Sequence, residues 1–228
     1  TGVGALALSE ANTYEGGTVV AEGSLIAANT SGSATGAGPV TVQASTILGG
    51  DGFIAPGANN GVMIDGQLLV GDPLASMGTD LSIVTSGTGS MVLGSGSTTT
   101  FDLWSGAGAG DNTALLTAAD LLVVGGTNGV MLDGTLEILN PNSMTTWAQD
   151  DSWKLFDWTA LSGGVTGSFS NLTSNVGNFA NLPDLSALAL AWDVSNLYTT
   201  GVITIVPEPG RMVLLAFGLM TLVVRRRR

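Results

Sequence analysis

The sequence predicts an all-β protein whose body is a β-solenoid, and three observations lead to this prediction. Gly accounts for 34 of the 228 residues, about twice its ordinary share, which indicates many tight turns. Short β-prone runs alternate with Gly, Asn and Ser, and such runs suit strands and are too short for helices. No periodic amphipathic segment of ordinary helix length occurs before Pro207.

The N-terminal stretch from residue 5 to residue 57 has this pattern most clearly. One pair of runs, TVVAEGSLIAAN, surrounds Gly23, and a second, PVTVQASTILGG, surrounds Ala44 and Ser45. Glycines in this stretch are expected to supply corners of positive φ: Gly16, Gly17, Gly23, Gly49, Gly50 and Gly52. Short strands joined by sharp corners are typical of a solenoid, whose coils stack to bury one continuous core.

A second regularity lies further along the chain. GVMIDGQLLV at 61–70 and GVMLDGTLEI at 129–138 are 68 residues apart and match at six of ten positions. Each is predicted to be a strand, an Asp-Gly turn and a strand, which indicates either a hairpin or a corner. Further strands are expected near Met91, Phe101 and Leu122. The register of the coils stays open, because a slip of one residue would exchange the inner and outer faces.

The C-terminal third of the body is richer in large side chains. Five of them are predicted to belong to the core: Trp153, Leu155, Phe156, Trp158 and Trp192. The segment NLPDLSALALAW, residues 181–192, is the one stretch of the body that suits a helical turn.

Charge is sparse and uneven. Residues 1–206 hold 17 acidic side chains and one basic one, Lys154, for a net charge of −16. Such a surface repels nucleic acid and either attracts divalent cations or keeps the protein soluble. The chain has no Cys and no His, which excludes disulfides, Ser–His–Asp and Cys–His nucleophiles, and zinc or haem sites that need these residues.

The C-terminus combines an apolar run with arginines. Residues 212–224 carry no charge and would span about 20 Å as a helix, against about 30 Å for a bilayer core. Arg211 precedes the run and Arg225, Arg226, Arg227 and Arg228 follow it. By the positive-inside rule, this pattern predicts a short transmembrane helix with the body outside the cytoplasm. The alternative is a C-terminal core helix with a basic tail.

The C-terminal tail consists of Pro207-Glu208-Pro209, the short apolar segment and the terminal arginines, in that order. This arrangement resembles a PEP-CTERM sorting signal. The resemblance implies export by the Sec route in a Gram-negative bacterium that makes exopolysaccharide. It also implies processing at or near Pro207, Glu208 and Pro209 by exosortase, an integral-membrane cysteine protease. The membrane would then hold the chain only transiently. Since the sequence starts at Thr1 instead of Met, the true N-terminus is expected to be missing, and any signal peptide would have been lost with it.

Two N-terminal segments are LSEANTYEGGTVVAEGSLIAANTSGSATGAGPVTV and LGGDGFIAPG. Together they resemble the autotransporter-associated β-strand repeat. That resemblance implies a right-handed parallel β-helix. The expected organisation is therefore a repeat domain at 1–57, a continuing Gly-rich β domain at 58–206, and the sorting signal at 207–228.

Candidate chemical groups are few. A glycosidase needs only two carboxylates, and the candidates are Asp150, Asp151, Asp157 and Asp184, although no spacing demands that they share a site. GGDGFIAPG faintly resembles a calcium-binding turn, but Asp51, Asp65 and Asp133 are interpreted as corner residues instead. GTGSMVLGSGS lacks the Lys-Ser/Thr ending of a phosphate-binding loop. The sequons at Asn29 and Asn171 are interpreted as coincidental.

The sequence thus favours a non-enzymatic exported protein of the cell surface or exopolysaccharide matrix, with a scaffolding or adhesive role. It predicts no cofactor, with calcium as a remote possibility, and exosortase and exopolysaccharide as partners. One alternative is an adhesin passenger fragment that uses the tail only as an anchor. Another is a carbohydrate-active enzyme on a β-helix.

Overall fold

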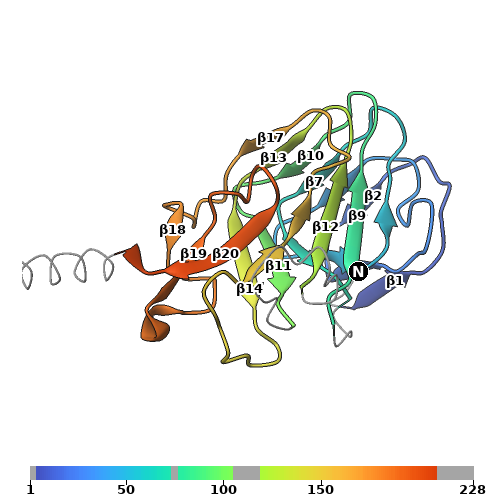
Figure 1. Ribbon diagram of the computed structural model, residues 1–228. Coiled ribbons are helices and arrows are strands. Elements are labelled where there is room, and N and C mark those ends of the chain that lie inside the picture. The colour runs from blue at the N-terminus through green and yellow to red at the C-terminus, as the bar shows by residue number, and fades with distance from the viewer. Residues whose placement is uncertain (1–3, 73–76, 105–118, 210–228) are drawn as a thin grey trace, which may run out of the picture.

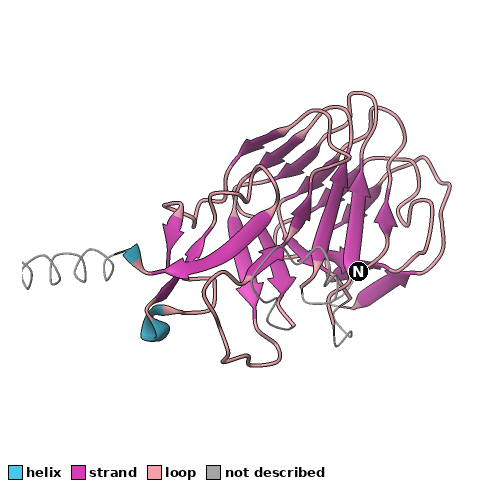
Figure 2. Cartoon of the chain, in the orientation of Figure 1, coloured by secondary structure: helices cyan, strands magenta, loops and turns pink. Residues whose placement is uncertain are grey.

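The computed structural model describes residues 4–72, 77–104 and 119–209, which form an all-β fold (Figure 1). Three parallel sheets account for most of this part of the chain, and an antiparallel sheet follows them. Figure 2 shows how fully strands and loops dominate the fold. The 3-10 helix η2 (Ser186–Leu188) lies where the sequence predicts a helical turn.

Each parallel sheet collects strands that are far apart in the sequence. Sheet A consists, in spatial order, of β1 (Ala5–Leu8), β3 (Ser24–Ala27), β5 (Ile47–Gly50), β8 (Gln67–Val70), β11 (Thr98–Asp102) and β14 (Thr135–Leu139). Sheet B consists of β2 (Thr18–Val20), β4 (Val40–Val42), β7 (Val62–Ile64), β10 (Met91–Leu93), β13 (Val130–Leu132) and β17 (Val165–Gly167). Sheet C consists of β6 (Phe53–Ile54), β9 (Asp80–Val84), β12 (Leu121–Gly125) and β16 (Phe156–Asp157).

The chain visits these sheets in a fixed order. It passes from B to A to C in β4–β5–β6, again in β7–β8–β9, and again in β10–β11–β12. Each circuit, here called a coil, adds one strand to each sheet, in parallel with the strand of the preceding coil. This topology is consistent with a β-helix-like fold.

The two Asp-Gly motifs are corners and not hairpins. The strands on either side of Asp65-Gly66, β7 and β8, belong to different sheets, and the same holds for β13 and β14 around Asp133-Gly134. The 68-residue spacing corresponds to two coils, because β10 lies between β7 and β13 in sheet B. The coil between them forms the same corner without an Asp-Gly pair, which is why the sequence comparison misses it.

The core consists of inward side chains stacked from coil to coil. In sheet A, Leu25, Leu48, Leu68, Thr99 and Leu136 occupy successive paired positions. All five side chains are buried. Full burial of a leucine contributes about 1.5–3 kcal/mol, so such ladders are the main source of stability.

The prediction that corner glycines have positive φ is confirmed for three of the six positions. Gly17, Gly23 and Gly50 have positive φ, as expected, whereas the prediction is wrong for Gly16, Gly49 and Gly52. Gly49 is required by close packing instead, since a Cβ there would meet the Leu69 carbonyl oxygen at 2.7 Å. At the corner before β5 it is Ser45 that adopts positive φ, at 65°.

The parallel coils do not continue to residue 206. An antiparallel sheet covers the end of the stack farthest from β1 (Figure 1), with the strand order β15 (Ser152–Lys154), β20 (Val202–Pro207), β19 (Leu190–Asp193) and β18 (Val176–Gly177). Trp147, Trp153 and Trp192 pack together there, with ring centroids 5.7–5.8 Å apart. Trp153, Leu155, Phe156 and Trp192 are buried and Trp158 is partly buried, which confirms the predicted core residues.

Asparagine side chains help to close this end of sheet A. The Asn171 Nδ2 donates to the Leu136 carbonyl at 2.9 Å, and its Oδ1 accepts from the Leu136 N–H at 3.0 Å. The Asn181 carbonyl accepts from the Ile138 N–H at 2.9 Å. These groups replace the next strand of the sheet, so the edge of β14 does not present a row of unpaired groups.

The expected transmembrane helix at 212–224 and the four arginines after it lie outside the described residues. In the part of the chain that the structure describes, no helix is long and apolar enough to cross a membrane.

Candidate functional site

The outer face of sheet B carries a straight row of uncharged side chains. Each of its strands directs its central residue outward, and the strand pairing brings these residues into register. The row, called the sheet B stripe, consists of Val19, Thr41, Met63, Val92, Met131 and Thr166. Val19, Met63 and Met131 are 63%, 48% and 49% exposed, so the stripe presents apolar surface to solvent. Exposed apolar side chains gathered in one row, instead of scattered singly, make this face the candidate interaction surface.

The stripe follows from the local sequence. In β7 and β13 the flanking residues are buried and the central Met is exposed, which is the period-two alternation of a strand with one face in the core. Parallel in-register stacking then places Val92 between Met63 and Met131. Since adjacent strands are about 4.8 Å apart, the six residues extend over about 24 Å along the stack.

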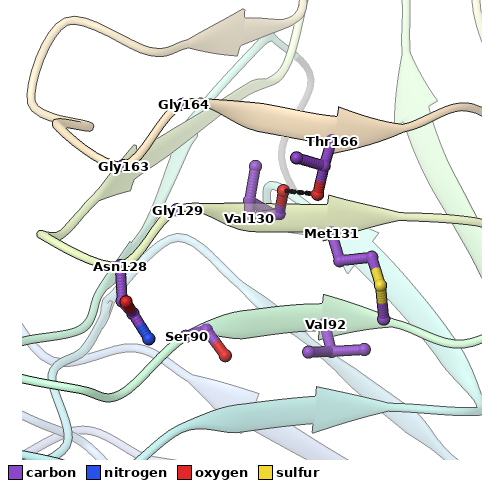
Figure 3. Close-up of a pocket in the computed structure, with 9 residues that line it drawn as sticks. All are labelled: Ser90, Val92, Asn128, Gly129, Val130, Met131, Gly163, Gly164 and Thr166. Carbon is purple, nitrogen blue, oxygen red and sulfur yellow. Dashed lines mark hydrogen bonds between the residues drawn. The ribbon is translucent and has the colours of Figure 1, made fainter.

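The stripe ends in a hollow of ≈ 220 Å³, shown in Figure 3. Its lining residues come from β10, β13, β17 and the turns that precede these strands: Ser90, Val92, Asn128, Gly129, Val130, Met131, Gly163, Gly164 and Thr166. In Figure 3 the Met131 side chain reaches from β13 toward β10 along one wall of the hollow. The sheet B hollow contains no charged side chain, so it suits a neutral ligand.

Polar groups in the sheet B hollow are held in place by the neighbouring coils. The Thr166 Oγ1 donates to the Val130 carbonyl at 3.1 Å, and the Asn128 Nδ2 donates to the Thr88 carbonyl at 2.7 Å. The Asn128 Oδ1 and the Thr166 hydroxyl can therefore accept hydrogen bonds in fixed orientations. Gly129 has a φ of 81°, and a Cβ there would meet the Gly164 carbonyl oxygen at 2.8 Å. The turn thus depends on glycine.

A second hollow, of ≈ 380 Å³, lies on the outer face of sheet C. Its lining residues are Asp51, Phe53, Gly78, Thr79, Asp80, Ser82 and Val123. Phe53 pairs with Ser82, and Ser82 with Val123, so these three side chains form a row across β6, β9 and β12. The Phe53 side chain is 39% exposed.

The sheet C hollow is acidic. Burial, and after it the negative charge of Asp157, raise the pKa of Asp80. For Asp157 burial acts in the same direction, but hydrogen bonds from Thr159 and the interaction with Lys154 outweigh it, so its pKa is lowered. The Lys154 Nζ lies 3.2 Å from the Asp157 Oδ1.

The sequence analysis misses a buried carboxylate, Asp120, whose side chain is only 2% exposed. It accepts hydrogen bonds from the backbone N–H groups of Thr79 and Asp102 and from the Trp104 Nε1. Burial raises its pKa to about 7, against these hydrogen bonds, and the charge of Asp102 adds to the increase. The one feature of the sequence that could have indicated a buried carboxylate here is the position of Asp120 directly before the apolar run LLVV.

The motif expected to be processed lies at the end of the last strand. Pro207 is the final residue of β20 and pairs with Leu190. The Glu208 N–H donates to the Ala189 carbonyl at 2.9 Å, and Pro209 is exposed. The first two residues of the motif are thus attached to the antiparallel sheet. Arg225, Arg226, Arg227 and Arg228 lie outside the described residues.

The four candidate catalytic carboxylates each have a local structural partner. The Asp151 Oδ2 accepts from the Ala148 N–H, and the Asp184 Oδ1 accepts from the Ser186 N–H at the start of η2. Asp150 has a positive φ of 70° and accepts from the Gln149 Nε2, while Asp157 pairs with Lys154. Asp150 and Asp151 adjoin β15, whereas Asp157 lies in β16 and Asp184 near η2.

The three aspartates weighed as calcium ligands are corner residues, as expected. Asp51 lies between β5 and β6, Asp65 between β7 and β8, and Asp133 between β13 and β14. The Asp133 Oδ1 accepts from the Gly134 N–H at 2.7 Å. Within residues 4–72, 77–104 and 119–209, no group of three or more acidic side chains could hold a metal ion.

No protein-family model matches the chain, and no significant match is found among curated proteins or among solved structures.

Proposed function

We propose that this protein is a non-enzymatic, exported component of the cell surface or exopolysaccharide matrix, with a scaffolding or adhesive role. The observation that carries the proposal is the sheet B stripe, an uncharged in-register row of about 24 Å that ends in an uncharged hollow. The body is proposed to be a right-handed parallel β-solenoid. Support comes from the repeated B–A–C circuit, because crossovers between parallel strands are almost always right-handed.

The chemistry of the stripe suits a polysaccharide chain. Sugar rings have apolar C–H faces and hydroxyl edges, and the stripe offers methyl and thioether groups beside threonine hydroxyls. A solenoid displays such groups at regular intervals along its axis, which matches a long repetitive ligand better than a compact one. The net charge of −16 over residues 1–206 disfavours polyanionic ligands.

The tail is proposed to be a sorting signal recognised by exosortase. Its segment at 212–224 would be a transmembrane helix that holds the precursor in the inner membrane, with the body outside the cytoplasm and Arg225–Arg228 inside. Pro209 is exposed directly after β20, which supports access of a protease to this position. The intact mass of the protein from its producer tests this. A chain ending near Pro207–Pro209 is expected, and a water-soluble chain that retains Arg228 would contradict it.

The stripe is tested by co-sedimentation with the exopolysaccharide of the producer. Met63→Asp and Met131→Asp each place a carboxylate in the row, and we expect the double variant to lose binding at least about tenfold. Leu188→Asp is the matched control, because Leu188 is 48% exposed but lies on η2, outside the stripe. Equal binding of the control and the double variant would contradict the assignment.

A further inference from the structure

We infer that the sheet C hollow binds a protonated amino sugar of a partly deacetylated polysaccharide. The inference rests on the proposed function, since it specifies one chemical class of polysaccharide and a second face that contacts it. Its evidence is the combination of an exposed aromatic ring, hydroxyl groups and carboxylates around a single hollow of ≈ 380 Å³.

The floor of the hollow provides an apolar surface of the kind that a sugar ring covers. Phe53, 39% exposed, lies in register with Ser82, and Val123 continues the row on the next strand. A pyranose ring can cover the Phe53 ring with its C–H face, as aromatic side chains generally contribute large apolar contact area.

Hydroxyl groups lie beside this surface. The Thr79 Oγ1 accepts a hydrogen bond from the Asp72 N–H at 2.7 Å, which leaves the Thr79 hydroxyl proton to be donated. Its backbone N–H donates to Asp120 at 3.2 Å, so Thr79 is held from two sides. Together with Ser82, it can contact the polar edge of a sugar ring.

The negative charge of the sheet C hollow favours a cationic ligand. Asp51 and Asp80 both line the hollow, and Asp157 is close enough to act electrostatically on Asp80. Lys154 lies 3.2 Å from Asp157, and among the described residues no ion pair to Asp51 or Asp80 is found. An ammonium group would form one, whereas a uronate would be repelled and an N-acetyl group would leave both carboxylates without a cation.

The test is calorimetric titration of the full chain with glucosamine oligomers and with N-acetylglucosamine oligomers of equal length, at about pH 6. We expect binding of the glucosamine oligomers alone, and weakening by at least about tenfold in Asp80→Asn and in Phe53→Ala. Asp184→Asn is the control, because it removes the same charge at an exposed site next to η2 that does not line the hollow. Asp80 is exposed at the edge of the hollow, so Asp80→Asn is expected to retain the fold even if Phe53→Ala does not.

Equal weakening by Asp80→Asn and Asp184→Asn would overturn the inference, because the oligomers would then be held only by the overall negative charge. Equal binding of the two oligomer types would overturn it as well. Failure to bind either oligomer, with retention by the producer's exopolysaccharide, would remove this inference and leave the proposed function intact. Loss of both would remove the proposed function too.

Discussion

The Asp120 carboxylate accepts a hydrogen bond of 2.9 Å from the backbone N–H of Asp102, and the two side-chain charges act on each other at the end of β11. Burial raises the pKa of Asp120 to about 7. Burial and the charge of Glu137 raise the pKa of Asp102 as well. A fold with this arrangement retains a proton at pH values where an unfolded chain has released it.

The stability of the protein should therefore fall as the pH rises from about 4 to about 7. In this range folded Asp120 binds more protons than unfolded Asp120, so the free energy of unfolding decreases with increasing pH. Asp120→Asn should flatten this slope. Urea unfolding of both proteins across the range provides the measurement, and an unchanged slope in the variant would show that Asp120 is not its source.

Truncation of a leucine in the stacked row of sheet A should destabilise the fold far more in the middle of the sheet than at its first strand. Leu68 is fully buried between two coils, and Leu68→Ala should destabilise the fold by about 2–5 kcal/mol. Leu6 pairs with Leu25 on the same row but is 58% exposed on the first strand, so Leu6→Ala should cost less than about 1 kcal/mol. Chemical denaturation would measure both losses of stability. Similar losses would contradict the placement of β1 at the exposed end of sheet A.

Alanine substitutions at two glycines of the sheet B hollow should distinguish the destabilisation caused by backbone strain from that caused by steric overlap. Gly164 has a φ of 78°, and a Cβ added there would have no heavy atom within 4 Å, so Gly164→Ala should cost about 1–2 kcal/mol. Gly129 has a similar φ, but its Cβ would meet the Gly164 carbonyl oxygen at 2.8 Å. Gly129→Ala should therefore cost clearly more. Thermal unfolding would compare the two, and the opposite order would be evidence against this turn geometry.

Asn171 should be important for the end of sheet A. Asn171→Ala removes both hydrogen bonds to Leu136 and should destabilise the fold by about 1–3 kcal/mol. Asn171→Asp retains an acceptor for the Leu136 N–H but removes the donor to its carbonyl, so a loss remains. Hydrogen exchange of the Leu136 amide provides a local measurement, and unaltered protection in the alanine variant would refute the role.

The parts of the fold that follow from short segments could be predicted from the sequence. The runs around Gly23 and the Asp65-Gly66 and Asp133-Gly134 corners lie where alternation and turn chemistry indicate them. The antiparallel sheet could not be predicted, since Trp153 pairs with Ile203 across 50 residues and no local pattern specifies that partner.

The candidate sites depend on register, which the sequence does not determine. The sheet B stripe exists because Met63, Val92 and Met131 are paired in three successive coils. A slip of one residue would direct these side chains inward. The Asp120 site likewise joins residues from three separate segments, and no spacing in the sequence indicates that they meet.

The most direct test of the central claim is the distribution of the protein in its producer after extraction of the exopolysaccharide. The wild-type protein should leave the cells with the polysaccharide, and a protein carrying Met63→Asp and Met131→Asp should be found in the polysaccharide-free medium. Retention of the wild-type protein on washed cells, or the same distribution for both proteins, would contradict a role in the matrix.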